Sequence, residues 1–164
     1  MIQVAVVTVS DSAVAGTRED RSGPALSERV AALGWSIHSR ELVPDEQDQI
    51  AAKLRQLADS GHIPVILTTG GTGVALRDVT PEATRGVIER EIPGLAELMR
   101  SEGRKFTPLS VLSRGLAGVR GRTLIVNLPG SPKGAVQSFD AIAQLIPHVV
   151  DLLEGRTSHG DVPH

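Results

Sequence analysis

The length and composition of this 164-residue chain exclude several classes of protein. A net charge of −2 provides no basic field for nucleic acid or a membrane surface, and an aromatic content of 2% argues against binding by base stacking. Cysteine is absent, which excludes disulfides, thiolate metal sites and a cysteine nucleophile. The N-terminal segment lacks the features of a signal peptide, and no apolar run is long enough to span a membrane, so we expect a cytoplasmic protein. The length of the chain is sufficient for a compact domain with its own hydrophobic core.

Four short apolar runs are expected to form strands, because they are rich in β-branched residues or alternate between apolar and polar side chains. They lie at 4–9, 35–43, 65–68 and 123–128. The second run alternates most clearly, which is typical of a strand at the edge of a sheet. The polar loop that follows the first run is expected to be flexible.

Apolar stripes at helical spacing, often preceded by a cap or a proline, predict the helices between these strands. The helices are expected to begin at Ser22, to surround Ile50, to run from Thr80 to about Arg90, to cover 95–100, and to run from Ser131 to Leu153 with a bend at Pro147. Glu89–Glu91 resembles an ordinary solvated face, and 106–121 has no clear pattern.

Alternating strands and helices indicate βαβ crossovers. We therefore predict a three-layer α/β/α sandwich with a mostly parallel central sheet. No repeat or low-complexity linker interrupts the chain, so we expect a single domain over 1–155, followed by a polar C-terminal tail at 156–164.

The stretch 64–83 has the most specific pattern in the chain. Its buried strand runs into Thr69-Gly70-Gly71-Thr72-Gly73, and a polar loop that carries Arg77 and Asp78 leads to the next helix. A strand that is followed by a glycine-rich turn, whose backbone amides no side chain covers, and by a helix N-terminus is suited to bind an anion, most often a phosphate. The loop lacks the Gly-Lys-Ser/Thr of a P-loop and the third glycine of a dinucleotide fingerprint, and a tight turn with positive φ is the other interpretation.

Polar residues follow each of the four predicted strands. They are Ser10 and Asp11, then Asp45, then the glycine-rich loop with Asp78, and finally Pro129-Gly130-Ser131. Because ligands of parallel α/β sheets bind outside the carboxyl ends of the strands, we expect these residues to meet at one rim that forms the binding site.

Asp45 and Asp78 are the carboxylates that we select as catalytic and metal-binding candidates. Two aspartates from neighbouring loops can hold Mg²⁺, with waters and substrate phosphates as the remaining ligands. The alternatives are a helix N-cap for Asp45 and a turn former for Asp78, and the role of Asp11 is equally ambiguous.

Three further residues are candidates for anion binding. Lys133 lies in the first turn of a predicted helix, where a cation is unfavourable unless a phosphate is nearby. Ser113 and Arg114 could hold another anion or could belong to a surface loop. The five histidines are scattered without ligand spacing, which argues against a zinc site.

Several motifs occur in a fixed order along the chain. They are VSDSAVAG after the first strand, LVPDEQ at 42–47, TTGGTG and RDVTPEAT in the central stretch, EIPG at 91–94, LSR at 112–114 and LPGSPK at 128–133. Together they resemble the molybdopterin adenylyltransferases of molybdenum cofactor biosynthesis, and the resemblance extends to about Gly155.

The resemblance implies an enzyme that transfers AMP from Mg-ATP to the terminal phosphate of molybdopterin and releases pyrophosphate. It implies a three-layer α/β fold, a homotrimer or hexamer, and a molybdenum-insertion protein as a possible partner. The two essential aspartates of the family correspond to Asp45 and Asp78. The resemblance further implies that the GGTG and PGSPK loops surround the nucleotide and that Ser113 lies on the pterin side. Asn127, directly before LPGSPK, is a further candidate for substrate binding.

Two other functions are compatible with the sequence. Paralogues with the same fold are thought to bind pterin or assemble without clear catalysis, and a nucleotide-binding regulator is a second alternative. The intact aspartates of the PDE and DVTPEA motifs favour the enzyme.

Overall fold

The computed structural model describes residues 1–156, and the predicted tail lies outside the described residues except for Arg156. The strands are β1 (Gln3–Val9), β2 (Ser36–Val43), β3 (Val65–Thr69), β4 (Arg90–Glu91), β5 (Ala117–Arg120) and β6 (Thr123–Leu128). The helices are α1 (Asp11–Ala15), α2 (Ser22–Ala32), α3 (Gln47–Asp59), α4 (Thr80–Arg85), α5 (Pro93–Gly103), the 3-10 helix η1 (Pro108–Leu112), α6 (Pro132–Ile142) and α7 (Ile146–Leu153). No helix of the described part is long and apolar enough to cross a membrane.

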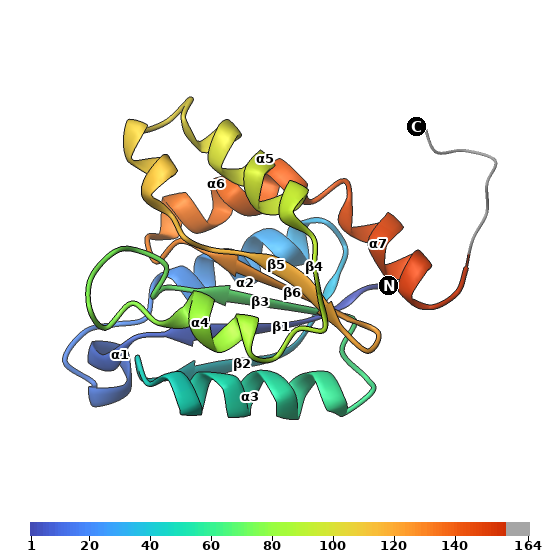
Figure 1. Ribbon diagram of the computed structural model, residues 1–164, viewed down its shortest axis with the longest axis horizontal. Helices are drawn as coiled ribbons and strands as arrows, with labels where there is room; N and C mark the ends of the chain where they lie inside the picture. Colours follow the sequence, from blue (N-terminus) through green and yellow to red (C-terminus); the bar gives the residue numbers. More distant parts are fainter. Residues whose placement is uncertain (157–164) are drawn as a thin grey trace.

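A mixed six-stranded sheet with the order β2-β1-β3-β6-β5-β4 forms the centre of the molecule (Figure 1). Strands β2, β1, β3 and β6 are parallel, while β5 and β4 are antiparallel to their neighbours. The predicted α/β/α sandwich with a mostly parallel sheet is confirmed, and β2 lies at an edge as expected. The carboxyl ends of the four parallel strands point in one direction, which places the loops that follow them at one rim.

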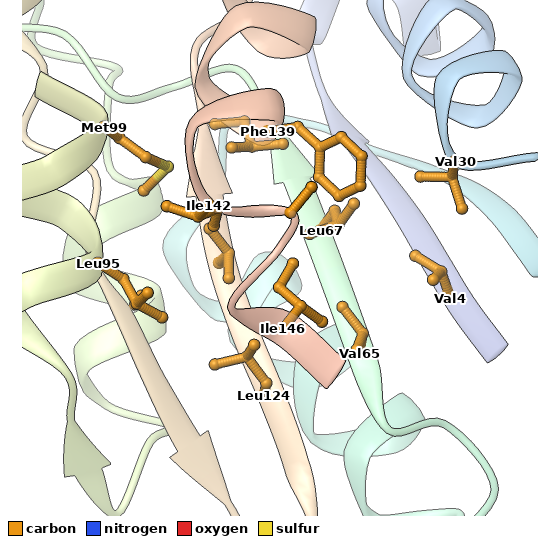
Figure 2. Packing of buried hydrophobic residues seen from close by; sticks show 14 of the residues in the cluster. Val4, Val30, Val65, Leu67, Leu95, Met99, Leu124, Phe139, Ile142 and Ile146 are labelled. Atoms are coloured by element: carbon orange, nitrogen blue, oxygen red, sulfur yellow. The ribbon is translucent and has the colours of Figure 1, made fainter. Parts of the chain in front are cut away.

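Two hydrophobic clusters lie on opposite faces of the sheet, because successive strand side chains point to opposite faces. In Figure 1, α5 and α6 lie above the sheet while α3 lies below it. Figure 2 shows Phe139 and Ile146 pointing toward Val65 and Leu67 of β3, on the face that α2 also covers. The other face of β3 presents Ile66, which belongs to the cluster formed with α3 and α4. Burial on both faces explains why the central strands are almost continuously apolar.

The helix predicted from Thr80 is too long, and one short helix was not predicted. Helix α4 ends at Arg85 rather than near Arg90, because the chain passes through Gly86 and Arg90–Glu91 then pairs with β5. Residues 89–91 are exposed as expected, although Arg90–Glu91 forms an edge strand rather than the end of a helix. The loop after β1 contains the short helix α1, which Ser10 caps by accepting a hydrogen bond from the Ala13 amide at 3.1 Å.

The long helix predicted from Ser131 to Leu153 is divided into α6 and α7. The apolar stripe continues through both helices, which is why the sequence pattern did not reveal the division. Pro147 does not bend one helix but lies in the first turn of α7, where its missing N–H is tolerated.

Phe139 is the largest fully buried side chain, and its ring lies edge-on to Trp35 with the centroids 5.8 Å apart. We expect Phe139→Ala to lower the free energy of unfolding by about 3–5 kcal/mol, because it removes apolar contacts and leaves a cavity beneath α6. Urea denaturation measures this loss. Leu152→Ala is the control, since Leu152 is 49% exposed and its loss should cost only about 0.5 kcal/mol. A loss below about 1 kcal/mol for Phe139→Ala would contradict the described packing.

Candidate functional site

Two cavities of about 500 Å³ each open at the rim formed by the carboxyl ends of the parallel strands. The first, which we call the β1-side cavity, is lined by residues that include Ser10, Asp20, Asp45 and Gly70. The second, the α6-side cavity, is lined by residues that include Thr72, Gly73, Leu112, Ser113 and Gln137. Both are lined by Gly71, Asp78, Gly130 and Ser131, which we call the junction. The sequence-predicted residues that follow the strands are thus brought together.

The turn between β3 and the junction requires glycine at two positions. Gly70 has φ +103° and Gly71 has φ +69°, a region that residues with a side chain rarely adopt. A Cβ on Gly70 would collide with the carbonyl oxygen of Val9 at the end of β1. The Cα of Gly70 also lies only 3.3 Å from where a Cβ of Gly130 would be placed. The loops after three strands therefore approach one another more closely than side chains would allow.

Thr80 holds this turn from the start of α4. Its hydroxyl donates a hydrogen bond of 2.9 Å to the carbonyl oxygen of Gly70, and its amide donates one of 3.1 Å to that of Gly71. Thr80 is fully buried, so these two bonds are shielded from water. The spacing between the GGTG and RDVTPEA motifs is explained by these contacts.

Asp45 and Asp11 hold each other in place through a reciprocal pair of hydrogen bonds. The Asp11 amide donates to Asp45 Oδ2 and the Asp45 amide donates to Asp11 Oδ1, both at 2.9 Å. This exchange joins the loops that follow β1 and β2. The helix N-cap considered for Asp45 is not formed, since Glu46 is the N-cap of α3 and has no side-chain capping bond.

Arg77 is bound to carboxylates on the outside of the rim. Its Nε donates to Asp11 Oδ2 at 2.6 Å, and its Nη2 donates to Asp11 Oδ1 at 3.1 Å and to Glu46 Oε1 at 3.0 Å. These contacts lower the pKa of Asp11 and raise that of Arg77. Arg77 is 57% exposed and lines neither cavity, so its immediate role is to fix Asp11, which in turn contacts Asp45.

Asp45 is the site carboxylate whose pKa is raised above the ordinary value. Burial is the main cause, and the negative charges of Asp11 and Asp78 raise the pKa further, while the hydrogen bond from the Asp11 amide acts in the opposite direction. The ionised form of Asp45 is therefore disfavoured unless a cation lies nearby.

The donor set of Asp45 and Asp78 fits Mg²⁺. Both side chains line the β1-side cavity, and Asp45 Oδ1 and Asp78 Oδ2 lie beside Gly71 and Gly73, respectively. Each side chain uses Oδ2 to accept an amide hydrogen bond, from Asp11 and from Ala75. Residues 1–156 contain no cluster of three or more acidic or histidine side chains placed for metal binding. A pair of carboxylates suits Mg²⁺, which completes its shell with waters and substrate phosphates.

Ser131 and Lys133 lie at the start of α6. Ser131 is the predicted N-cap, and its Oγ accepts a hydrogen bond of 3.0 Å from the Gly134 amide. Because Ser131 lines both cavities, the N-terminal end of the helix reaches the junction. Lys133 is exposed in the first turn and lines neither cavity.

The remaining candidates occupy different positions. Ser113 lines the α6-side cavity, while Arg114 does not line it and contacts Glu82 of α4. Asn127 is buried in β6, where its amide group accepts from the Leu116 amide and donates to the hydroxyls of Thr68 and Thr84. The structure thus gives Asn127 and Arg114 partners within the protein.

Several residues that line the cavities had not been selected from the sequence. Asp20 lines the β1-side cavity, where it accepts hydrogen bonds from the Thr8 hydroxyl and the Gly23 amide, both at 3.0 Å. Asp20 could have been selected from the sequence, because it is an acidic residue just before the start of a predicted helix. Gln137 and Ser138 line the α6-side cavity, one turn after Gly134, and helical spacing from the PGSPK motif would have identified them.

Comparison with known proteins assigns the chain to one family. Residues 5–148 match the family described as "Probable molybdopterin binding domain". The chain belongs to this family. The molybdopterin adenylyltransferase of Helicobacter pylori J99 is 42% identical, over 94% of this chain and 89% of that protein. That of Escherichia coli K12 is 37% identical, over 94% and 86%.

A solved structure titled as the molybdopterin biosynthesis enzyme MoaB from Thermus thermophilus is also similar to this chain. It superposes with a TM-score of 0.89 at 52% identity, over 94% of this chain and 98% of that chain. The resemblance to the molybdopterin adenylyltransferase family inferred from the motifs is thereby confirmed, together with the fold.

The raised pKa of Asp45 leads to a prediction about the stability of the protein. A folded-state pKa above the ordinary 3.8 means that ionised Asp45 destabilises the fold at neutral pH. We expect Asp45→Asn to increase the free energy of unfolding at pH 7, and the increase to disappear as the pH falls below 3.8. Urea denaturation in EDTA, from pH 3 to pH 7, measures both effects.

Asp48→Asn provides the control for this measurement. Asp48 is exposed in the first turn of α3, where a negative charge is favourable, so its replacement should not stabilise the protein. A decrease in stability at pH 7 for Asp45→Asn would contradict the described electrostatics.

Proposed function

We infer that the protein is a molybdopterin adenylyltransferase, an enzyme of molybdenum cofactor biosynthesis. The observation that carries this conclusion is the 37–42% identity, over 94% of the chain, to curated proteins with that name. The activity and the enzyme class predicted from the motifs are confirmed by these relatives. The non-catalytic paralogue considered from the sequence is not favoured, since both motif aspartates line the β1-side cavity.

Each cavity is suited to one substrate. The α6-side cavity has apolar residues such as Val74, Leu109 and Leu112 beside the polar Ser113 and Gln137, a combination suited to a pterin ring with polar edges. The β1-side cavity contains Arg18 and Arg21 together with four acidic residues, Glu19, Asp20, Asp45 and Asp78. Arginines can contact a triphosphate directly, and carboxylates are suited to the metal ion that accompanies it. Molybdopterin in the first cavity and ATP in the second would meet at the junction.

The reaction is an attack by the terminal phosphate of molybdopterin on the α-phosphorus of ATP. An oxygen of the pterin phosphate forms a bond to the α-phosphorus, the bond from that phosphorus to the bridging oxygen of the β-phosphate breaks, and pyrophosphate leaves. The attacking phosphate is already ionised near neutral pH, so no strong general base is required. Positioning and charge neutralisation supply most of the rate in such transfers.

The protein contributes to this reaction through backbone and carboxylate groups at the rim. Asp45 and Asp78 would hold Mg²⁺, which when bound neutralises charge on the phosphates. Gly71 and Gly130 line both cavities, and the backbone amides of these glycines would bind a phosphate of the substrates. Lys133 and Arg77 lie farther out and would offset charge at longer range.

The remaining features follow from the family resemblance and are part of the same proposal. We propose that the domain over 1–155 forms a homotrimer or hexamer in the cytoplasm. Its product, adenylylated molybdopterin, would pass to a molybdenum-insertion protein. Size-exclusion chromatography with light scattering determines the oligomeric state.

Pyrophosphate release by the purified protein with molybdopterin and Mg-ATP tests the function. We expect Asp78→Asn to reduce kcat by at least about 100-fold, because charge neutralisation at the phosphates contributes several kcal/mol of transition-state stabilisation. Asp48→Asn, which alters an exposed carboxylate of α3 that lines neither cavity, should retain full activity. Full activity in a correctly folded Asp78→Asn variant would show that the assignment is wrong.

A further inference from the structure

Arg114 makes an unusual set of contacts for an exposed residue. Its Nε donates to the carbonyl oxygen of Gly73 and its Nη2 donates to that of Asp78, both at 2.7 Å. Nη1 and Nη2 donate to the two carboxylate oxygens of Glu82 at 2.7 and 3.1 Å. The Arg114 amide also donates to the carbonyl oxygen of Thr72 at 2.8 Å. All three guanidinium nitrogens are therefore occupied by the protein itself.

These contacts join two segments that both line the α6-side cavity. One segment, 72–78, follows β3 and carries Asp78 to the junction. The other follows η1 and carries Ser113, the residue before Arg114, into the α6-side cavity. Glu82 lies in the first turn of α4, so the guanidinium is anchored to a helix as well as to the loop. The planar fork of arginine holds such partners in one geometry, which a lysine cannot do.

The contacts contribute more to geometry than to stability. The side chains of Arg114 and Glu82 are 38% and 44% exposed, and ion pairs at this exposure stabilise a fold only slightly. Their pairing lowers the pKa of Glu82 and raises that of Arg114, so both are charged throughout the neutral range. The Arg114 contacts add little stability, but they link the backbone at Asp78 to the segment that carries Ser113. We therefore expect them to determine how these two segments are placed relative to each other.

We propose that Arg114 is a positioning residue that sets the distance between the Asp78 loop and the Ser113 loop, and thereby aligns the two substrates at the junction. The proposal rests on the proposed adenylyl transfer, because alignment matters only where two bound groups react. Arg114 then acts through Asp78 and Ser113 and contacts neither substrate. A misplacement of about 1 Å at a reacting centre can reduce a rate by about 100-fold.

The test compares Arg114→Lys with a matched control, Arg120→Lys. Arg120 has the same type of contacts, since it donates to both oxygens of Asp59 and to the carbonyl oxygen of Val87, but it lines neither cavity. We expect Arg114→Lys to lower kcat by about 10- to 100-fold while the KM values for ATP and molybdopterin change by less than about 3-fold. Arg120→Lys should leave kcat within about 2-fold of the unchanged protein.

Hydrogen exchange of the amides in 72–78 provides a readout that does not depend on activity. We expect faster exchange in this segment for Arg114→Lys and no change there for Arg120→Lys, because local opening follows the loss of local contacts. Glu82→Gln, which keeps the shape of the side chain but removes its charge, should produce the same changes in smaller measure. It keeps the proposal testable if Arg114→Lys does not fold.

Three results would overturn the proposal. The first is an Arg114→Lys variant in which neither kcat nor KM changes. The second is an Arg114→Lys variant with an increased KM and an unchanged kcat, which would indicate direct substrate binding. The third is an equal loss of kcat in Arg120→Lys. Absence of turnover in the unchanged protein would instead reject the proposed function. The exchange of 72–78 would then still decide whether Arg114 holds this loop.

Discussion

The close approach of Gly70 to the ends of two neighbouring strands is the constraint on which the rest of the site depends. Gly70 lies against the carbonyl oxygen of Val9 on one side and beside Gly130 on the other. Any side chain at Gly70 would push the loops after β1 and β3 apart. Since Gly71 and Gly130 both line the two cavities, this contact determines where the cavities meet.

Around that contact, each of the two site aspartates is held by an arginine that does not line either cavity. Arg77 fixes Asp11, which exchanges backbone hydrogen bonds with Asp45, and Arg114 binds the carbonyl oxygen of Asp78. Burial and neighbouring negative charges disfavour the ionised form of Asp45. The folded protein therefore contains a carboxylate whose ionised form is unfavourable and would be stabilised by a bound cation. Carboxylates with a perturbed pKa of this kind are common at functional sites.

Local patterns were sufficient to predict the parallel strands and the residues that follow them, because both depend on neighbours in sequence. The partners of Arg114 were not predictable in this way, since Gly73, Asp78 and Glu82 lie 32 to 41 positions away. For the same reason the sequence left two interpretations of Arg114 open, an anion-binding group and a residue of a surface loop. Strands β4 and β5 were missed because they are too short to show alternation and are defined by pairing with each other. The roles proposed for Asp45 and Asp78 came from the motif set, because each residue alone resembled a cap or a turn former.

The central claim is that adenylyl transfer takes place at the junction formed by Gly71, Asp78, Gly130 and Ser131. A crystal structure with molybdopterin and a non-hydrolysable ATP analogue tests it most directly. The account predicts the pterin in the α6-side cavity, the nucleotide in the β1-side cavity, and the α-phosphate at the junction beside Asp78. An α-phosphate bound away from the junction, or both ligands in one cavity, would contradict it.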